Sequence, residues 1–419
     1  MVCYSRGMKV SEELTKRGFI YQFSAETLAE IFDGEKRTIY HGIDPTADSA
    51  HAGNFVIWLL LRHLAAAGHK IVFLVGGGTG MIGDPKPDAE RELKDESLVD
   101  SNVAKIKLQA ERLIGQGGDI AFVNNKDWLG SVGLLEFLRD VGKHFTVNEL
   151  IKKDAIAKRV ASDTGISYTE FAYPLLQGYD YLVLNRLYGC TVQVGGSDQW
   201  GNIIAGVDLI RRKEQKTTYA VTVPLIVDKE TGKKFGKSEG NAVWLDAAKT
   251  SPYAFYQFWL NVSDVNVSDY LRLFTFLPLT TIDEILETHT DNPSLRIAQK
   301  TLAHEVTVLV HGEEEATAAR RVSDILFSDA SIDSIDEATK TVLLHNAPTY
   351  AVKTPQSILA LLVASGLASS NREAREFISN GAVILNGERV TDETMLVSIA
   401  PGAYMTLRRG KKQFMVLTA

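Results

Sequence analysis

A histidine and an asparagine lie three positions apart in His51-Ala52-Gly53-Asn54, directly before a long apolar segment that is typical of a buried helix. Free backbone N–H groups and the helix dipole favour an anion at such a helix start. A histidine with N–H donors could stabilise phosphoryl oxygens in a transition state, and Gly53 would let a nucleotide approach the backbone. The alternative is a helix N-terminus that is simply capped by polar side chains.

Two lysines three positions apart lie in the segment Lys233-Lys234-Phe235-Gly236-Lys237-Ser238. On a mobile loop, Lys234 and Lys237 could close over a triphosphate and then release pyrophosphate. A solvated lysine-rich turn is the alternative interpretation.

A phenol, an amide and a carboxylate share one helix face in the stretch YPLLQGYD. Tyr173, Gln177 and Asp180 fall at positions i, i+4 and i+7 of that helix. Such a face is ill suited to pure core packing and well suited to a small zwitterion that carries its own hydroxyl group. A buried polar cluster with satisfied hydrogen bonds would show the same spacing, so both interpretations stay open.

Two glycine-rich loops follow apolar strands. Val75–Pro85 contains five glycines, yet it is neither the dinucleotide fingerprint nor a P-loop, because both the G-x-G-x-x-G spacing and a Gly-Lys-Ser/Thr are missing. Asp84 in this loop could bind a cationic amino group or could form an Asp-Pro turn. In the second loop, Asp198 could accept hydrogen bonds from ribose hydroxyls beside Gly196, and an N-cap is the alternative.

These loops need strands and helices to position them. Helical patterns such as Asn54–Ala67 and Leu98–Ile114 alternate with short apolar runs up to about residue 240. The runs have the continuous apolar character of strands buried on both faces of a parallel sheet; they are Thr38–Ile43, Ile71–Val75, Ile120–Val123 and Thr191–Val194. The alternation predicts a doubly wound α/β domain, in which ligands bind at the carboxyl ends of the strands.

The pattern changes beyond residue 240. Helical periodicity dominates from 241 to 346, for example in Pro252–Leu260. The stretch 347–355 has two prolines and no apolar period, which indicates a linker. In the remaining segment, 356–419, two short helical patterns precede Asn386-Gly387, a dipeptide typical of a tight hairpin.

The composition is that of a globular protein, with 45% hydrophobic and 23% charged residues. The net charge is −7, but Lys353–Ala419 has eight Lys/Arg and five Asp/Glu, so a basic tail of +3 follows a body of −10. A basic tail is a weak signal for a nucleic-acid partner. There is no signal-peptide pattern and no apolar run near the roughly 20 residues of a membrane span. Cys3 and Cys190 exclude a disulfide framework and a thiolate zinc site. We therefore expect a cytoplasmic protein.

In their order along the chain, these motifs resemble those of bacterial tyrosyl-tRNA synthetases. The resemblance rests on Tyr40–Ser49 (YHGIDPTADS), the HAGN motif, YPLLQGYD, GGSDQWGN and KFGKS, and on Ser369–Val390, which is similar to an S4-type RNA-binding domain. It implies a class I aminoacyl-tRNA synthetase with a Rossmann-like doubly wound catalytic domain at 1–240. A helical anticodon-arm-binding domain at 241–346, a linker at 347–355 and a small α+β S4-like domain at 356–419 would follow.

The resemblance also implies roles for the amino-acid site. Tyr40 and Asp180 would hydrogen-bond the phenol hydroxyl of L-tyrosine. The α-amino group would be held by Asp84, Tyr173 and Gln177.

On the nucleotide side, the resemblance implies that ATP is a substrate. The residues implied to bind ATP are Asp44 near the activated carboxyl group, Gly53, Gly196, Asp198, Gln199, Lys237 and Ser238. Those implied to stabilise the reacting phosphates are Thr46, His51, Asn54, Lys234 and Lys237. Mg²⁺ would accompany ATP through phosphates and water rather than through a tightly bound protein site. The implied partners are tRNA(Tyr) and a second copy in a homodimer, with neither DNA nor a membrane.

Two positions and one segment depart from the family pattern. Asn54 stands where many relatives have a second histidine, and His41 replaces a frequent cysteine beside the nucleotide. The segment Lys86–Arg91 is shorter and less basic than the corresponding loop, which puts phosphate contacts of its cations in doubt.

Three other functions stay open on the sequence alone. They are a tryptophanyl-tRNA synthetase, a catalytically idle relative that binds structured RNA, and a nucleotidylyltransferase without RNA binding. Tyr40 with Asp180 and the S4-like tail disfavour the first, and the intact His51, Asp198 and Lys237 disfavour idleness.

Overall fold

The computed structural model describes residues 7–86, 92–115, 118–162, 165–232, 235, 237–238, 241–327, 336–410 and 413–419, with the backbone alone at 154, 155, 237, 238, 241 and 338. The chain forms two compact units. Unit 1 is Met1–Asp246 with Val262–Ala298, and unit 2 is Ala247–Asn261 with Gln299–Ala419. The domain boundaries expected at 240, 346 and 355 stay predictions.

Unit 1 is built around a sheet whose described strands follow the order β1-β6-β5-β2-β3-β4. All neighbouring pairs are parallel except β1 with β6. The four predicted strands are confirmed, and the sequence analysis missed the two at the β6 edge. The strands are β1 Gln22–Phe23, β2 Thr38–Ile43, β3 Lys70–Val75, β4 Ile120–Asn124, β5 Cys190–Gly196 and β6 Tyr219–Val223.

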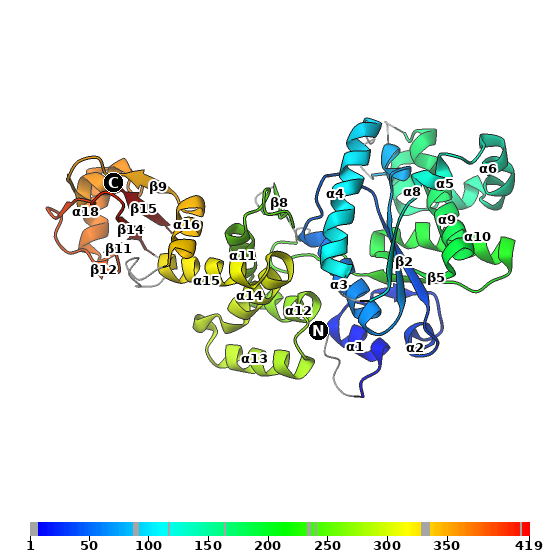
Figure 1. Cartoon of the computed structure of the whole chain (residues 1–419), viewed down its shortest axis with the longest axis horizontal. Helices are drawn as coiled ribbons and strands as arrows, with labels where there is room; N and C mark the ends of the chain where they lie inside the picture. The colour runs from blue at the N-terminus through cyan, green and yellow to red at the C-terminus, as the bar shows by residue number, and fades with distance from the viewer. Residues whose placement is uncertain are drawn as a thin grey trace. The chain divides into compact units, whose positions relative to one another are not determined.

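Helices cover both faces of this sheet (Figure 1): α3 (Ala52–Ala66) and α4 (Glu96–Ile114) lie on one face, and α9 (Tyr168–Tyr188) and α10 (Trp200–Glu214) lie on the other. On the α3 face, the Trp58 ring meets Phe73 of β3 edge-on, with centroids 5.5 Å apart. On the α9 face, Leu182 and Leu209 pack in one buried cluster with Val72. Helices on both sides explain why these strands are mostly apolar, with His41 and Gln193 as buried polar exceptions.

The order of the strands reverses between β2 and β5. From β2 the chain proceeds outward to β3 and β4, and it then returns to the other side of β2 through β5 and β6. The loops at the carboxyl ends of β2 and β5 therefore diverge, which leaves a crevice at this point of the sheet.

The remaining elements of unit 1 are short. They are α1 Val10–Arg17, α2 Leu28–Phe32, η1 Thr79–Met81, α5 Lys126–Leu129, α6 Leu134–Asp140, η3 Gly142–His144, α7 Val147–Leu150, α8 Asp154–Val160, η4 Ser197–Gln199, the hairpin β7 Lys237–Ser238 with β8 Asn241–Ala242, α12 Asp264–Phe274, α13 Leu279–Asp291 and η5 Pro293–Leu295.

A buried arginine anchors α1. Arg17 is 2% exposed and pairs with Glu13, with 2.7 Å between Nε and Oε1. Its guanidinium also donates to the backbone carbonyls of Arg272, Thr275 and Leu277, where α12 ends. Arg272 lies in the last turn of α12, whose carbonyls have no partner within the helix, and Thr275 and Leu277 follow that turn. One side chain therefore binds three backbone carbonyls at this helix end.

Unit 2 begins with the predicted helical elements, α11 Pro252–Leu260, α14 Ile297–His311, α15 Glu313–Phe327 and α16 Glu337–Asn346. It continues with β9 Thr349–Ala351, β10 Gln356–Ser357, α17 Ile358–Ala364, α18 Asn371–Ser379, β11 Val383–Leu385, β12 Glu388–Arg389, β13 Leu396–Val397, β14 Tyr404–Arg409 and β15 Gln413–Thr418. The predicted hairpin at Asn386-Gly387 is confirmed, and both residues have positive φ angles, 46° and 87°.

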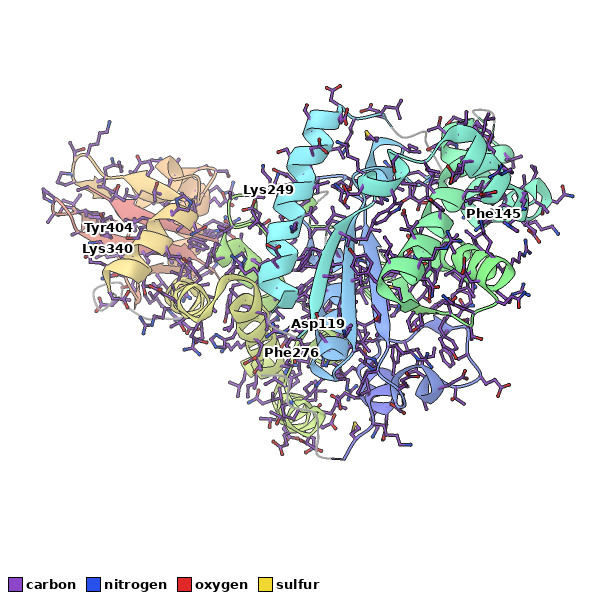
Figure 2. All side chains as sticks on the ribbon, turned by 45° about the vertical axis from the view of Figure 1, so that its right-hand side comes forward. Asp119, Phe145, Lys249, Phe276, Lys340 and Tyr404 are labelled. Carbon is purple, nitrogen blue, oxygen red and sulfur yellow. The ribbon has the colours of Figure 1, made fainter. Side chains whose placement is uncertain are left out.

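Part of the segment expected to be a linker is a strand. β9 pairs in parallel with β15 at the edge of the sheet β12-β11-β14-β15-β9. Nearby, Figure 2 shows Lys340 of α16 beside Tyr404 of β14, and its ammonium lies 4.6 Å from the ring centroid. The sequence analysis missed β9 because it has only three residues and follows a proline.

No helix in the described part of the chain combines the length and apolarity that crossing a membrane requires.

Candidate active site

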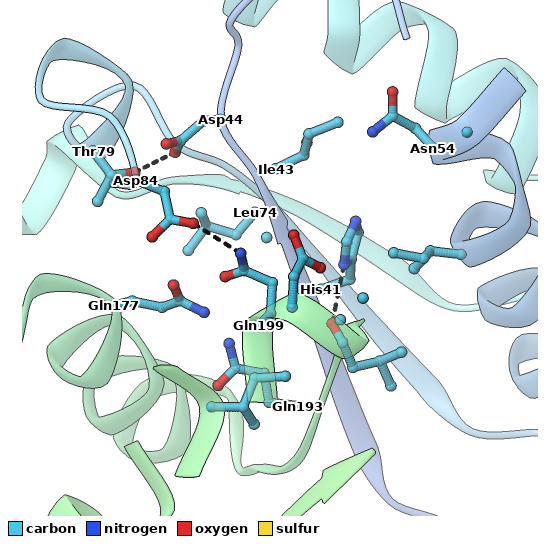
Figure 3. Close-up of a pocket in the computed structure, with 18 of the residues that line it drawn as sticks. His41, Ile43, Asp44, Asn54, Leu74, Thr79, Asp84, Gln177, Gln193 and Gln199 are labelled. Atoms are coloured by element: carbon cyan, nitrogen blue, oxygen red, sulfur yellow. Dashed lines mark hydrogen bonds between the residues drawn. The ribbon is translucent and has the colours of Figure 1, made fainter. Parts of the chain in front are cut away.

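The carboxyl ends of β2 and β5 open onto a cavity of about 420 Å³ in unit 1 (Figure 3). Most of the sequence-predicted site residues line it: Tyr40, Asp44, Thr46, His51, Gly53, Asn54, Asp84, Tyr173, Gln177, Asp180, Gly196, Asp198 and Gln199. Lys234 lies outside the described residues. Of Lys237 and Ser238, the structure describes the backbone, as strand β7, and no side chain.

At one end of the cavity, Tyr40 and Asp180 are almost completely buried, with 1% and 3% exposure. The Asp180 carboxylate accepts hydrogen bonds from Asn125 Nδ2 at 2.9 Å and from Trp128 Nε1 at 2.7 Å. By contrast, the Tyr40 hydroxyl has no hydrogen-bond partner among the described residues. Because an unpaired buried hydroxyl is costly, this end of the cavity is suited to a polar group of a ligand.

Burial raises the pKa of Asp180 from 3.8 to about 7. The hydrogen bonds from Asn125 and Trp128 oppose this shift, whereas the negative charge of Asp44 adds to it. Burial also raises the pKa of the Tyr40 phenol well above 10. Tyr40 is therefore a neutral hydroxyl, and Asp180 is a carboxyl group that titrates near neutrality.

Elsewhere in the cavity, the carboxylate of Asp44 accepts from Thr79 Oγ1 at 2.7 Å and from the Tyr173 hydroxyl at 2.9 Å. The carboxylate of Asp84 accepts from Gln199 Nε2 at 2.9 Å and from Asn202 Nδ2 at 3.0 Å. The Asp84–Gln199 and Thr79–Asp44 bonds are drawn in Figure 3.

The amide of Gln177 has no hydrogen-bond partner in the described part of the chain, and it lies on the same wall of the cavity as Tyr173. The helix face predicted from the i, i+4, i+7 spacing is thus confirmed, since both residues and Asp180 lie on α9 and line the cavity. Together with Asp44 and Asp84, this region has the negative charge and the acceptors that a cationic amino group requires.

On the nucleotide side, His51 and Asn54 form a capping box at the start of α3. The Gly53 N–H donates to His51 Nδ1 at 3.0 Å, and the His51 N–H donates to Asn54 Oδ1 at 3.2 Å. The capping alternative is therefore correct, yet both side chains also line the cavity. Because Nδ1 accepts, Nε2 is the protonated nitrogen of a neutral His51 ring, a tautomer assigned from its partner.

The segment after the β7–β8 hairpin holds His51 in place. Ala52 donates its N–H to the Val243 carbonyl at 2.8 Å, and Leu245 donates to Ala50 at 2.9 Å. The rings of His51 and Trp244 lie edge-on, with centroids 6.1 Å apart.

His41 is buried beside the same strands. Its Nδ1 lies 3.0 Å from the Val194 carbonyl, a bond drawn in Figure 3, so Nδ1 carries the proton and Nε2 is an acceptor. Burial lowers the pKa of His41 to about 4, although this hydrogen bond opposes the shift. The departure from a family cysteine thus introduces a neutral hydrogen-bonding ring rather than a cation.

Contacts within the protein explain the glycines of the Val75–Pro85 loop. A Cβ on Gly76 would lie 2.3 Å from both Asp44 Oδ1 and Thr79 Oγ1, and a Cβ on Gly77 would lie 2.4 Å from Asn124 Oδ1. Gly53 is similar, since its Cβ would lie 2.9 Å from the His51 ring. These glycines therefore let side chains in and beside the cavity approach the backbone closely.

Sequence reasoning missed several residues of the site: Thr79, Asn125, Trp128 and Asn202. The pair Asn124-Asn125 directly at the end of an apolar strand was the signal that could have found one of them, since polar residues at that edge of a parallel sheet face its ligand crevice.

Comparisons with known proteins agree with this fold and site. A family model described as tRNA synthetases class I (W and Y) matches residues 33–328. A second, described as a Tyrosine–tRNA ligase SYY-like C-terminal domain, matches residues 339–417. The Tyrosine–tRNA ligase of Streptococcus mutans is 49% identical over 421 residues, covering 98% of this chain and 100% of that protein. Tyrosine–tRNA ligase 1 of Streptococcus thermophilus is 48% identical with the same coverage.

Among solved structures, a C-terminally truncated mitochondrial tyrosyl-tRNA synthetase of Aspergillus nidulans is similar, with a TM-score of 0.66 and 32% identity over 75% of this chain and 92% of that one. The chain belongs to the class I tRNA synthetases of the W and Y group and, within that group, to the tyrosine–tRNA ligases.

Proposed function

We propose that the cavity of unit 1 activates L-tyrosine with ATP and that the enzyme then transfers tyrosine to the 3′-terminal ribose of tRNA(Tyr). One observation carries the amino-acid assignment. The Tyr40 hydroxyl is buried without a partner, and it lies at the same end of the cavity as the titratable carboxyl group of Asp180. A substrate phenol would accept from Tyr40 and donate to Asp180, whereas phenylalanine would leave both groups without that partner.

The other end of the substrate fits the remaining polar groups. The α-ammonium group would bind among Asp84, Gln177 and Tyr173, with Asp44 near the carboxyl group. Burial raises the pKa of the Tyr173 phenol well above 10, so this residue is a neutral hydroxyl.

For ATP, we propose that Asp198 and Gly196 bind the ribose and that Gly53, Gln199 and Ser238 also contact the nucleotide. Thr46, His51, Asn54, Lys234 and Lys237 would stabilise the phosphates. The tyrosine carboxylate attacks the α-phosphorus in line, and pyrophosphate leaves. The tRNA hydroxyl then attacks the adenylate carbonyl, and AMP leaves. Neither step needs a nucleophile from the protein, so catalysis comes from positioning and electrostatic stabilisation.

Mg²⁺ would accompany ATP. The described residues contain no group of three or more His, Cys, Asp or Glu side chains placed to hold a metal ion. Phosphate oxygens and water are the ligands that Mg²⁺ usually keeps beside a nucleotide, which fits an ion that arrives with its substrate.

A homodimer is the proposed assembly, in the cytoplasm. Helices α6 and α7 and the start of α9 carry apolar side chains that are 62% to 82% exposed in the single chain: Leu134, Leu135, Val147 and Tyr168. A second copy would cover them. Sedimentation velocity of Leu135→Glu tests this, since a variant that sediments as the wild type does would contradict the proposed interface.

The experiment for the main proposal is ATP–pyrophosphate exchange with each of the twenty amino acids. Tyrosine alone should drive exchange, and Asp180→Asn should lose most of it. Asp208→Asn is the matched control, because that carboxylate is exposed on α10 and pairs with Arg211. Exchange driven by tryptophan, or by no amino acid, would contradict the proposal. Aminoacylation of a tRNA(Tyr) transcript tests the second step.

A further inference from the structure

A chain of hydrogen bonds joins Asp44 to Asp180 through two side chains that have no role in the mechanism above. Thr79 Oγ1 donates to Asp44 Oδ1 at 2.7 Å. Asn125 Nδ2 donates to Thr79 Oγ1 at 2.9 Å and to Asp180 Oδ2 at 2.9 Å. Thr79 and Asn125 are 2% and 0% exposed, so water does not compete for these groups.

The direction of each bond in this chain is fixed. The Gly78 N–H donates to Asn125 Oδ1 at 2.8 Å, so the amide cannot be flipped without placing two donors face to face. Both amide protons of Asn125 are then committed, one to Thr79 and one to Asp180. Because the threonine hydroxyl accepts from Asn125, its single proton must go to Asp44.

The backbone is shaped around this contact. A methyl group at Gly76 would come within 2.3 Å of both the Thr79 and the Asp44 oxygen atoms. The 3₁₀ turn Thr79–Met81 follows, and the Thr79 carbonyl accepts the Gly83 N–H at 2.8 Å. Thr79 is thereby held by its backbone as well as by its hydroxyl.

We propose that Thr79 is a positioning residue that couples the carboxyl end of the site to its hydroxyl end and thereby contributes to selectivity for tyrosine over phenylalanine. This inference rests on the proposed function. Without the hydroxyl, Asp44 loses a donor and one buried N–H of Asn125 loses its acceptor. The amide can recover a partner only by rotating away from Asp180 or from Gly78, so a change beside Asp44 displaces the groups that recognise the phenol.

Substitution of Thr79 by valine tests the coupling, since it removes the hydroxyl and keeps the shape. In amino-acid-dependent pyrophosphate exchange, kcat/KM for tyrosine should fall about 10- to 100-fold, as expected for lost buried hydrogen bonds. The value of kcat/KM for phenylalanine should fall less. Phenylalanine has no hydroxyl for Asp180 to bind, so it loses only the effect of the altered Asp44. The tyrosine-to-phenylalanine ratio should therefore fall about tenfold.

Two further variants control for general damage to the fold. T79S keeps a hydroxyl and should restore the ratio to within about threefold of the wild type. T191V makes the same chemical change on β5, where the buried Thr191 hydroxyl has no partner among the described residues, and it should leave the ratio unchanged. If T79V lacks the thermal unfolding transition of the wild type, T79A replaces it in the same comparison.

Equal losses for tyrosine and phenylalanine in T79V would overturn the coupling, as would a T79S ratio no better than that of T79V. Either result, with tyrosine-driven exchange intact in the wild type, would contradict the proposed role of Thr79 and leave the proposed function standing. Absence of tyrosine-driven exchange in the wild type would instead contradict the proposed function.

Discussion

Tyrosine recognition should depend on pH through Asp180. The pKa of this buried carboxyl group is raised to about 7, so it loses its charge as the pH falls through neutrality. The ionised form can accept from Asn125, from Trp128 and from a substrate hydroxyl together. Protonation adds a hydrogen to one of its oxygen atoms. The carboxyl group then has one acceptor fewer, and its own O–H faces the N–H and O–H donors of its neighbours and the substrate. We therefore expect affinity for tyrosine to be highest above neutrality.

The size of the effect follows from the ionised fraction. For a pKa of about 7, about 97% of Asp180 is ionised at pH about 8.5 and about 3% at pH about 5.5. If only the ionised form recognises the hydroxyl, affinity should fall about 30-fold over this range.

Phenylalanine is the internal control for this measurement. Other ionisable groups in the cavity, such as Asp44, Asp84 and His51, face parts that both amino acids share or the nucleotide. The ratio of the two dissociation constants, measured by equilibrium dialysis without ATP, therefore isolates Asp180. His41 does not contribute in this range because its pKa is lowered to about 4.

Two results would refute this reasoning. One is a ratio that stays constant between the two pH values in the wild type. The other is a pH dependence that persists in Asp180→Asn, which has no titratable group at that position. Asp208→Asn should keep the full wild-type slope.

Three other perturbations have definite expected results. Gly76→Ala places a methyl group 2.3 Å from two oxygen atoms of the cavity and should lower tyrosine-dependent exchange about 10- to 100-fold. Gly115→Ala is the control and should leave exchange unchanged, because no atom lies within 4 Å of the added methyl group. Arg17→Met leaves a buried carboxylate unpaired and should lower the free energy of unfolding of unit 1 by about 3–5 kcal/mol in urea titration, while the exposed Lys16→Met should leave the midpoint unchanged. Truncation after Asn346 should keep adenylate formation, whose cavity lies in unit 1, and should greatly reduce tRNA charging. Equal loss of both activities would contradict this division of the two activities along the chain.

The place of the truncation follows from β9. A cut after Pro355, at the end of the expected linker, would leave Thr349–Ala351 without its partner strand β15. It would also expose Val352, which is 4% exposed in the intact chain because it packs in the hydrophobic core of the C-terminal sheet. The family match to the C-terminal domain likewise begins before the expected linker, at residue 339.

Most strands of unit 1 were predictable from short apolar runs. β3 has an apolar run that is almost wholly buried, and β2 and β5 are mostly apolar although His41 and Gln193 interrupt them. β4 was predictable from its apolar run even though it is only partly buried. β6 was missed because Thr222 interrupts its short run. Thr222 is fully buried, and its hydroxyl donates to the Gln22 carbonyl of β1 at 3.3 Å. A polar residue can occupy such a strand when a neighbouring strand supplies its hydrogen bond, and that partner is invisible in the sequence.

The site shows the same limit. Spacing along one helix predicted that Tyr173, Gln177 and Asp180 share a face. It could not predict the hydrogen bond of Tyr173 to Asp44, which lies 129 positions away, or that of Asp180 to Asn125, 55 positions away. Such contacts depend on which loops the parallel sheet brings to one edge, and local periodicity carries no information on that.

The capping box at His51 bears on the Asn54 departure. Asn54 supplies the oxygen that accepts the His51 N–H, so the capping box needs an acceptor there and no charge. A histidine could do the same only through an unprotonated ring nitrogen. His41 is neutral as well, so neither of these two departures supplies a positive charge to the phosphates. In the proposed mechanism, Lys234 and Lys237 would supply that charge. They precede Val243 in the chain, whose carbonyl accepts the Ala52 N–H. On this proposal we expect the two lysines, rather than position 54, to supply positive charge to the phosphates.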